Sequence, residues 1–327
     1  YGRGVCSSWA WNAYGTHVRL DSRRLCRPRP GCRTYWIYQP VYVCGIVNRP
    51  EGTPKTSPIQ QRDDTSLPPY ATHLHSWFMW YVRGYIRRHF HAVRLLNPPD
   101  GRSPIPDIVD EPVLLYTNHP SWWDPLIFLS VAQKLFPDRL NYGPIDSTAL
   151  GRYSFLEKIG FLGIEPDSWK GAARFLRLAK AALERPDVFF WVTAQGDFVD
   201  PRYRPVTIKP GVGHAAAVAK RGLIIPFALE YPFWNERLPE AIVSFGEPHR
   251  IDQHTKHDAD EWNQILAASL EETQNELRDA AIARNPNAFT ELASGTVGIG
   301  GAYDIIRRIR STLSGKTFNP AHEEEPA

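Results

Sequence analysis

The segment Leu114–Phe128, LLYTNHPSWWDPLIF, joins an apolar run to a polar stretch that contains a histidine, two tryptophans and an aspartate. The apolar run belongs to a predicted buried strand, Pro112–Thr117. After the polar stretch, Pro125–Leu135 has the apolar spacing of a helix. His119 and Asp124 lie on the connection between the two. Functional side chains of α/β proteins gather at such strand ends. We therefore expect a functional site in this connection between a strand and a helix.

The same alternation of strands and helices continues on both sides of this segment. Predicted strands are Pro112–Thr117, Arg139–Tyr142, Phe161–Ile164, Val188–Val192, Leu223–Leu229 and Ala241–Phe245. Predicted helices are Pro125–Leu135, Gly151–Ile159, Trp169–Glu184, Gly213–Lys220 and Ala259–Ala283. This pattern predicts an α/β fold, with a mixed, mostly parallel central sheet and helices on both faces.

The chain divides into four segments by composition. Residues 1–70 read as a disordered or non-native lead and a Pro-rich linker, and they hold all four cysteines. Residues 71–98 are expected to form a membrane-docking helix, and 99–285 the main domain. Residues 286–327 read as a C-terminal extension with a short helix near Ile299–Arg310 and an acidic tail.

The expected docking helix covers His75–Leu96 and is amphipathic. Apolar residues such as Phe78, Val82 and Ile86 share one face, and Arg83, Arg87, His91 and Arg94 share the opposite face. Tryptophan and tyrosine side chains flank the apolar stripe, as in helices that lie on membrane surfaces. A helix packed on a core with a solvated basic face is the alternative interpretation.

Bulk properties exclude some classes of protein and leave others open. The net charge is +3, the basic residues after Pro50 are balanced by acids, and no recognition motif appears, so we expect no nucleic-acid partner. The sequence has no run of eighteen or more apolar residues, so we predict no transmembrane helix. The HxH pairs His73/His75 and His89/His91 have no acidic or cysteine partner nearby, so no metal is expected.

The spacing of His119 and Asp124 indicates a catalytic pair. The Asp carboxylate can accept a hydrogen bond from one ring nitrogen, which leaves the other nitrogen free to act as a general base. The chain has no GxSxG motif, so a base would act on a substrate hydroxyl. By spacing alone, an Asp that caps the helix and a His bonded to a loop carbonyl is an equal alternative.

Four blocks in order resemble the glycerolipid acyltransferase family, which contains the 1-acylglycerol-3-phosphate acyltransferases. The blocks are Asn118-His119-x4-Asp124, Ala194-Gln195-Gly196 with Arg202 after it, Lys209-x-Gly211, and Ile224-Ile225-Pro226, and the resemblance covers Trp77 to Pro248. It implies a glycerol-3-phosphate acyltransferase-like fold and a transfer of a fatty acyl group to a hydroxyl of a lipid. It also implies His119 as the base and Asp124 as its orienting partner. Substrate contacts are expected from Asn118, Ser121, Trp122, Gln195, Gly196, Arg202, Lys209 and Gly211.

The resemblance also implies the partners of the chain. The acyl donor is acyl-CoA or an acyl carrier protein, used as a co-substrate without another cofactor. The lipid acceptor stays open between a lysophospholipid and a neutral or glycosylated lipid. Gln195 replaces the glutamate of the family, and Glu165-Pro166-Asp167 stand where the family has a phosphate-binding arginine. The enzyme is expected to be cytoplasmic and peripheral on the inner face of the membrane.

Two other functions are compatible with these residues. The same His–Asp pair would activate water in a thioester or ester hydrolase. A non-catalytic family member would bind lipid without needing either His119 or Asp124.

Overall fold

The structure is a computed structural model that describes residues 10–11, 17–18, 66–252 and 254–295. The chain splits into two compact units, Tyr1–Ile59 and Gln60–Ala327. In the first unit, β1 (Ala10–Trp11) pairs antiparallel with β2 (His17–Val18). The other residues of the expected lead up to residue 65, which include the four cysteines, lie outside the described residues. The helix expected near Ile299–Arg310 also lies outside them.

The described part of the second unit holds a nine-stranded mixed sheet of order β11-β3-β9-β8-β4-β7-β5-β6, with β10 paired to β8. The strands β8, β4, β7, β5 and β6 run parallel to one another, and β9 runs antiparallel to β8. The sheet comprises β3 (Ala92–Leu96), β4 (Val113–Thr117), β5 (Leu140–Asp146), β6 (Phe161–Ile164), β7 (Val188–Thr193), β8 (Gly222–Glu230), β9 (Glu240–Phe245), β10 (His249–Ile251) and β11 (Phe289–Ser294). The predicted α/β fold with a mixed, mostly parallel sheet is confirmed.

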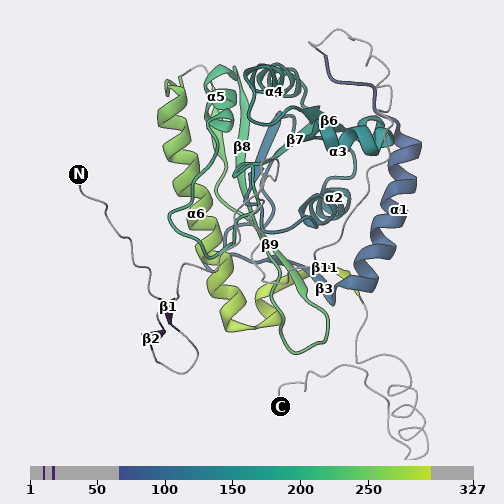
Figure 1. Ribbon diagram of the computed structural model, residues 1–327, viewed down its shortest axis with the longest axis vertical. Helices are drawn as coiled ribbons and strands as arrows, with labels where there is room; N and C mark the ends of the chain where they lie inside the picture. Colours follow the sequence, from purple (N-terminus) through teal and green to yellow (C-terminus); the bar gives the residue numbers. More distant parts are fainter. Residues whose placement is uncertain (1–9, 12–16, 19–65, 253, 296–327) are drawn as a thin grey trace, which may run out of the picture. The chain divides into compact units, whose positions relative to one another are not determined.

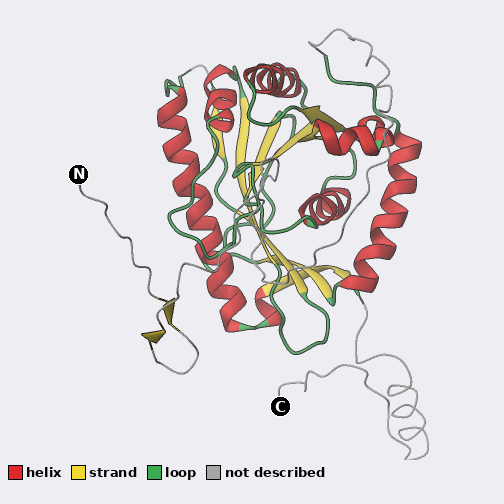
Figure 2. Cartoon of the chain, in the orientation of Figure 1, coloured by secondary structure: helices red, strands yellow, loops and turns green. Residues whose placement is uncertain are grey.

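Helices cover both faces of this sheet (Figures 1 and 2). On one face, α1 (Thr72–His89) and α2 (Asp124–Leu135) bury residues such as Val82 and Ile127. On the other face, α4 (Trp169–Ala182), α5 (Gly211–Val218) and α6 (Ala259–Ala283) bury residues such as Leu266. Short helices α3 (Ser147–Arg152), η2 (Ser154–Ile159) and η3 (Pro286–Ala288) complete the described elements. Because both faces are covered, the central strands are buried throughout and read as apolar runs in the sequence.

Several predicted elements match the structure closely, and one helix is divided. The bounds of β6 and α6 are those predicted, and β4 and α2 begin within one residue of the prediction. The predicted helix Gly151–Ile159 is instead two elements, α3 and η2. Gly160 adopts a positive φ of 99° directly after η2, a conformation that ends the helical segment and favours glycine.

The predicted helix His75–Leu96 is wrong in its last third. The helix α1 ends at His89, and Ala92–Leu96 form the strand β3, which lies between β11 and β9 inside the sheet. Arg94, expected on the basic face of a helix, is buried and donates from Nε to Glu240 Oε2 at 2.9 Å. His91 is also buried and bonds to the same carboxylate. Neither residue is available to a membrane surface.

The expected segment boundaries also shift, because the sheet recruits residues beyond them. Leu67 and Tyr70, placed in the lead, pack against the core, and the Pro68 carbonyl accepts a bond from Tyr142 at 2.7 Å. Strand β3 joins residues 92–96 to the main domain, and β11 does the same for residues 289–294 of the expected C-terminal extension. The compact domain therefore begins before residue 70 and extends past residue 285.

Candidate active site

Three strands bring the expected site residues to one edge of the sheet. The strands β4, β7 and β8 are parallel neighbours, so their carboxyl ends meet at that edge. His119 follows β4, Gln195 follows β7, and Tyr231 follows β8. These three residues lie far apart in the chain, and the parallel strands bring them to the same edge of the sheet.

His119 and Asp124 form the pair that the sequence predicts. His119 Nδ1 lies 2.6 Å from Asp124 Oδ2, and the exposed fractions of the two side chains are 18% and 2%. Asp124 begins α2, where the peptide dipoles of the first turn favour a negative charge. With Nδ1 donating to the carboxylate, Nε2 is the nitrogen of His119 left to accept a proton.

Tyr231 is a third member of this hydrogen-bonded group, and no sequence motif predicted it. Its hydroxyl donates to Asp124 Oδ1 at 2.6 Å, and the Ser121 N–H donates to Oδ2 at 3.2 Å. Burial, helped by the neighbouring Asp124 carboxylate, raises the pKa of Tyr231 well above its usual value. The phenol therefore stays protonated and holds Asp124 in place as a donor. Tyr231 lies 107 residues from Asp124 in the chain, beyond any local motif.

The side chains of Asn118 and Gln195 fix the loop that carries His119 through bonds to main-chain groups. Asn118 is fully buried, and its side-chain amide exchanges two 2.9 Å bonds with the backbone of Leu229 on β8. Its side chain is not exposed and bonds to main-chain groups, and the substrate contact expected of Asn118 stays a prediction. Gln195 Oε1 accepts the His119 N–H at 2.9 Å, which ties the end of β7 to the loop after β4. A glutamine serves this purpose as a neutral acceptor.

The two glycines of the expected substrate blocks serve the backbone. Gly196 has a φ of 74°, and its N–H donates to the Thr193 carbonyl at 3.1 Å, so it does not offer a donor to an oxyanion. A Cβ at Gly211 would lie 3.2 Å from the Phe175 ring, so this glycine lets the start of α5 approach α4. The substrate contacts expected of both residues stay predictions without a contact that supports them.

The cations on the loop after β7 lie against carboxylates or carbonyls. Arg202 donates twice to Asp200, at 2.9 and 2.7 Å, and Lys209 Nζ lies 3.1 Å from Asp167 and 3.6 Å from Asp197. Their roles in substrate binding stay predictions.

Arg204 on the same loop is directed toward α6. It donates to Asn275 Oδ1 at 2.9 Å and to the Pro201 carbonyl at 2.7 Å. Beside it, burial raises the pKa of Glu230 to about 7, although Arg204 and Arg278 favour the charged form. Glu230 and Tyr231 are consecutive at the end of β8, so one faces α6 and the other faces Asp124.

One exposed aromatic ring lies against His119, and two tryptophans on the same loop contact α1. The Phe198 ring lies 4.4 Å from the His119 ring, between centroids, and is 64% exposed. Trp122 is also exposed and meets Tyr85 of α1 edge to face. Trp123 is partly buried and donates from Nε1 to the Tyr85 hydroxyl at 3.2 Å. The sequence analysis did not identify Phe198, which lies three residues after Gln195 and outside the four blocks.

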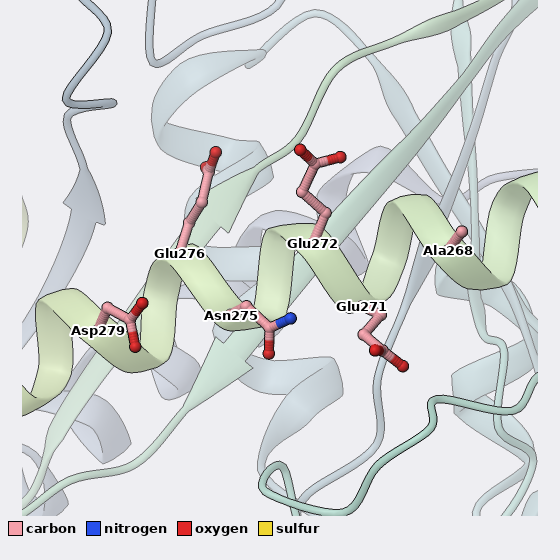
Figure 3. Close-up of a pocket in the computed structure, with 6 residues that line it drawn as sticks. All are labelled: Ala268, Glu271, Glu272, Asn275, Glu276 and Asp279. Carbon is pink, nitrogen blue, oxygen red and sulfur yellow. The ribbon is translucent and has the colours of Figure 1, made fainter.

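A separate groove runs along α6, and none of its lining residues belongs to this site. Figure 3 shows the side chains that line it: Ala268, Glu271, Glu272, Asn275, Glu276 and Asp279. Glu271 accepts the Val206 N–H at 2.6 Å, and Glu276 pairs with Arg102 at 2.7 Å. These carboxylates anchor neighbouring loops to the helix. Among the described residues, no three His, Cys, Asp or Glu side chains gather as a metal site would require.

The comparisons with protein families and with curated proteins found no match. None of the helices in the described residues has the length and apolar character needed to cross a bilayer. The function must therefore be argued from the site.

Proposed function

We propose that this protein is an O-acyltransferase that moves a fatty acyl group from a thioester donor, acyl-CoA or acyl carrier protein, to a hydroxyl of a lipid. One observation carries the proposal: a His119–Asp124 pair at 2.6 Å, whose buried carboxylate is held by Tyr231 and Ser121 beside the exposed Phe198. The resemblance of four ordered blocks to glycerolipid acyltransferases supports the reaction class and a glycerol-3-phosphate acyltransferase-like fold.

The reaction follows from the geometry of the pair. His119 Nε2 takes the proton of the acceptor hydroxyl as its oxygen attacks the thioester carbonyl. Asp124 stabilises the imidazolium that forms, since its remaining bonds come from the neutral Tyr231 hydroxyl and a backbone N–H. When the tetrahedral intermediate collapses, the C–S bond breaks and the imidazolium returns the proton to the leaving thiolate. A positioned base of this kind accelerates the reaction about 100- to 10,000-fold.

The first test is thioester release from palmitoyl-CoA and from palmitoyl carrier protein, with and without lipid acceptors. Wild-type protein should release thiol only with an acceptor, and His119→Ala should lose this activity. His214→Ala is the matched control, because His214 lies exposed on α5 and contacts the Pro210 carbonyl. Release without an acceptor would indicate a hydrolase, and no release from either donor would leave a lipid-binding protein.

We also propose that α1 docks the enzyme on an anionic membrane surface, at the cytoplasmic face. Trp77, Trp80 and Tyr81 are exposed on this helix, which carries no acidic residue. Arg83 and Arg88 are exposed on the same helix and would each contribute about 1 kcal/mol near anionic lipids. Tyr85 on α1 contacts Trp122 and Trp123, so the helix adjoins the catalytic loop.

Vesicle flotation tests this docking. Replacing Trp77, Trp80 and Tyr81 by serine should weaken binding to phosphatidylglycerol vesicles roughly 10-fold or more, because the buried aromatic area is lost. Trp169→Ser is the matched control, since Trp169 is 78% exposed but lies on α4. Equal losses from both changes would contradict a docking role specific to α1.

A further inference from the structure

Phe198 is an exposed side chain that lies against the ring of His119, the proposed base. Its ring lies 4.4 Å from the His119 ring at an interplanar angle of 44°, and the next residue, Val199, donates its N–H to the His119 carbonyl at 3.0 Å. This backbone bond ties the loop that carries Phe198 to the catalytic residue. Most of the ring faces solvent. A substrate that brings a hydroxyl to His119 therefore meets an exposed apolar ring beside it.

The charged side chains that follow Phe198 on its loop are paired with carboxylates, which disfavours an anionic substrate group. On the loop that carries Phe198, Arg202 and Lys209 face Asp200, Asp197 and Asp167, so two cations meet three carboxylates. The hydrogen bonds from Arg202 lower the pKa of Asp200 to about 2, so this carboxylate is charged at neutral pH. A phosphate is held best by an arginine or lysine that can approach it without a competing carboxylate. A phosphate that entered here would have to displace these carboxylates and remain close to them.

We infer that the lipid acceptor is free of phosphate near its reacting hydroxyl, and that its uncharged ring or chain lies on Phe198. This inference rests on the proposed acyl transfer. Two sources share the chemistry, namely a glycolipid, whose pyranose carries an apolar C–H face, and an open-chain alcohol such as a monoacylglycerol. In both, the hydroxyl gives its proton to His119 and its oxygen forms the new ester, as in the reaction above.

The experiment compares two acceptors that differ only in the phosphate, together with a simple glycolipid. Initial rates of thiol release are measured with 1-oleoylglycerol, with 1-oleoylglycerol-3-phosphate, and with octyl glucoside, using palmitoyl-CoA and palmitoyl carrier protein as donors. We expect kcat/KM to be at least about 10-fold higher for one of the phosphate-free acceptors, and the better of the two identifies the source. A preference for 1-oleoylglycerol-3-phosphate overturns the inference and leaves the acyltransferase intact. Release that no acceptor stimulates overturns the proposed function itself.

Variants of Phe198 test the surface directly. Phe198→Ala should raise KM for the preferred acceptor roughly 3- to 10-fold and leave kcat nearly unchanged, because an aromatic stacking contact is lost. Phe198→Arg should instead increase the use of 1-oleoylglycerol-3-phosphate. Phe233→Ala is the matched control, since Phe233 is 62% exposed on the loop after β8. If Phe198→Ala changes neither KM nor the order of acceptors, the acceptor does not lie on this ring.

Discussion

Two histidine–carboxylate pairs, His119–Asp124 and His91–Glu240, lie at the same edge of the sheet and have the same donor atom. In each pair Nδ1 of the histidine faces a carboxylate oxygen. They differ in what else reaches the carboxylate. Asp124 receives the neutral Tyr231 hydroxyl and the Ser121 N–H, whereas Glu240 receives the Arg94 guanidinium at 2.9 Å. The charge of Glu240 is thus balanced already, and that of Asp124 remains to stabilise an imidazolium.

Access separates the two histidines as well. His119 lies beside the exposed Phe198, while His91 is buried where β3 and β9 begin. A base must reach the proton that it removes, so only the first pair suits catalysis. A histidine–carboxylate distance alone would not have distinguished them.

Replacing the histidine of each pair should have very different effects on activity. His119→Ala should lower acceptor-dependent thiol release about 100- to 10,000-fold, because the general base is lost. His91→Ala should leave the rate per folded molecule near that of the wild type. Both variants would be assayed after their folded fractions are measured by circular dichroism. A comparable rate loss in well-folded His91→Ala would contradict the assignment.

The next effect concerns stability at the buried pair. Glu240→Gln removes the charge that balances Arg94, so we expect a loss of about 3–5 kcal/mol in the free energy of unfolding. Urea denaturation measures it. Glu291→Gln is the control, because Glu291 also lies near Arg94, at 3.5 Å, but is largely exposed and should contribute less than about 1 kcal/mol. Equal losses would mean that Arg94 does not depend on Glu240.

Tyr231→Phe tests what holds Asp124. The change removes a hydrogen bond to a charged group, worth about 1.5–3 kcal/mol, and should lower kcat roughly 10- to 100-fold with little change in KM. Phe retains the ring contacts with Phe90 and Trp123. A larger KM with an unchanged kcat would place Tyr231 in substrate binding instead.

The free energy of unfolding should depend only weakly on the protonation of His91 in the His91–Glu240 pair. A neutral His91 can still donate a hydrogen bond to Glu240. The hydrogen bond to Glu240 raises the pKa of His91 above its usual value, against the opposing effect of burial. The folded state therefore binds this proton more tightly than the unfolded state. The stabilisation should be complete below the unfolded pKa of about 6.5 and be lost as the pH rises through the folded value. Urea titrations of wild type and His91→Gln should converge at alkaline pH, and a gap that widens there would contradict this sign.

Local patterns in the sequence determined most of the core elements. The strands β4 and β8 were predicted because burial on both faces leaves a continuous apolar run. The helix α6 was predicted because burial on one face leaves a helical period. The pairing of His119 with Asp124 was predicted for a similar reason, since a strand end and a helix start fix their separation. These features depend on residues that are neighbours in the chain.

Only the tertiary structure decided the rest, because the partners lie far apart in the chain. Arg94 lies in a buried strand because Glu240, 146 residues away, neutralises it, so its charge falsely suggested a solvated helix face. Tyr231 joins Asp124, and Gln195 holds the His119 N–H, across parallel strands whose ends meet only when the sheet forms. Composition and spacing set which elements form, and the long-range pairing of those elements set which of their side chains work together.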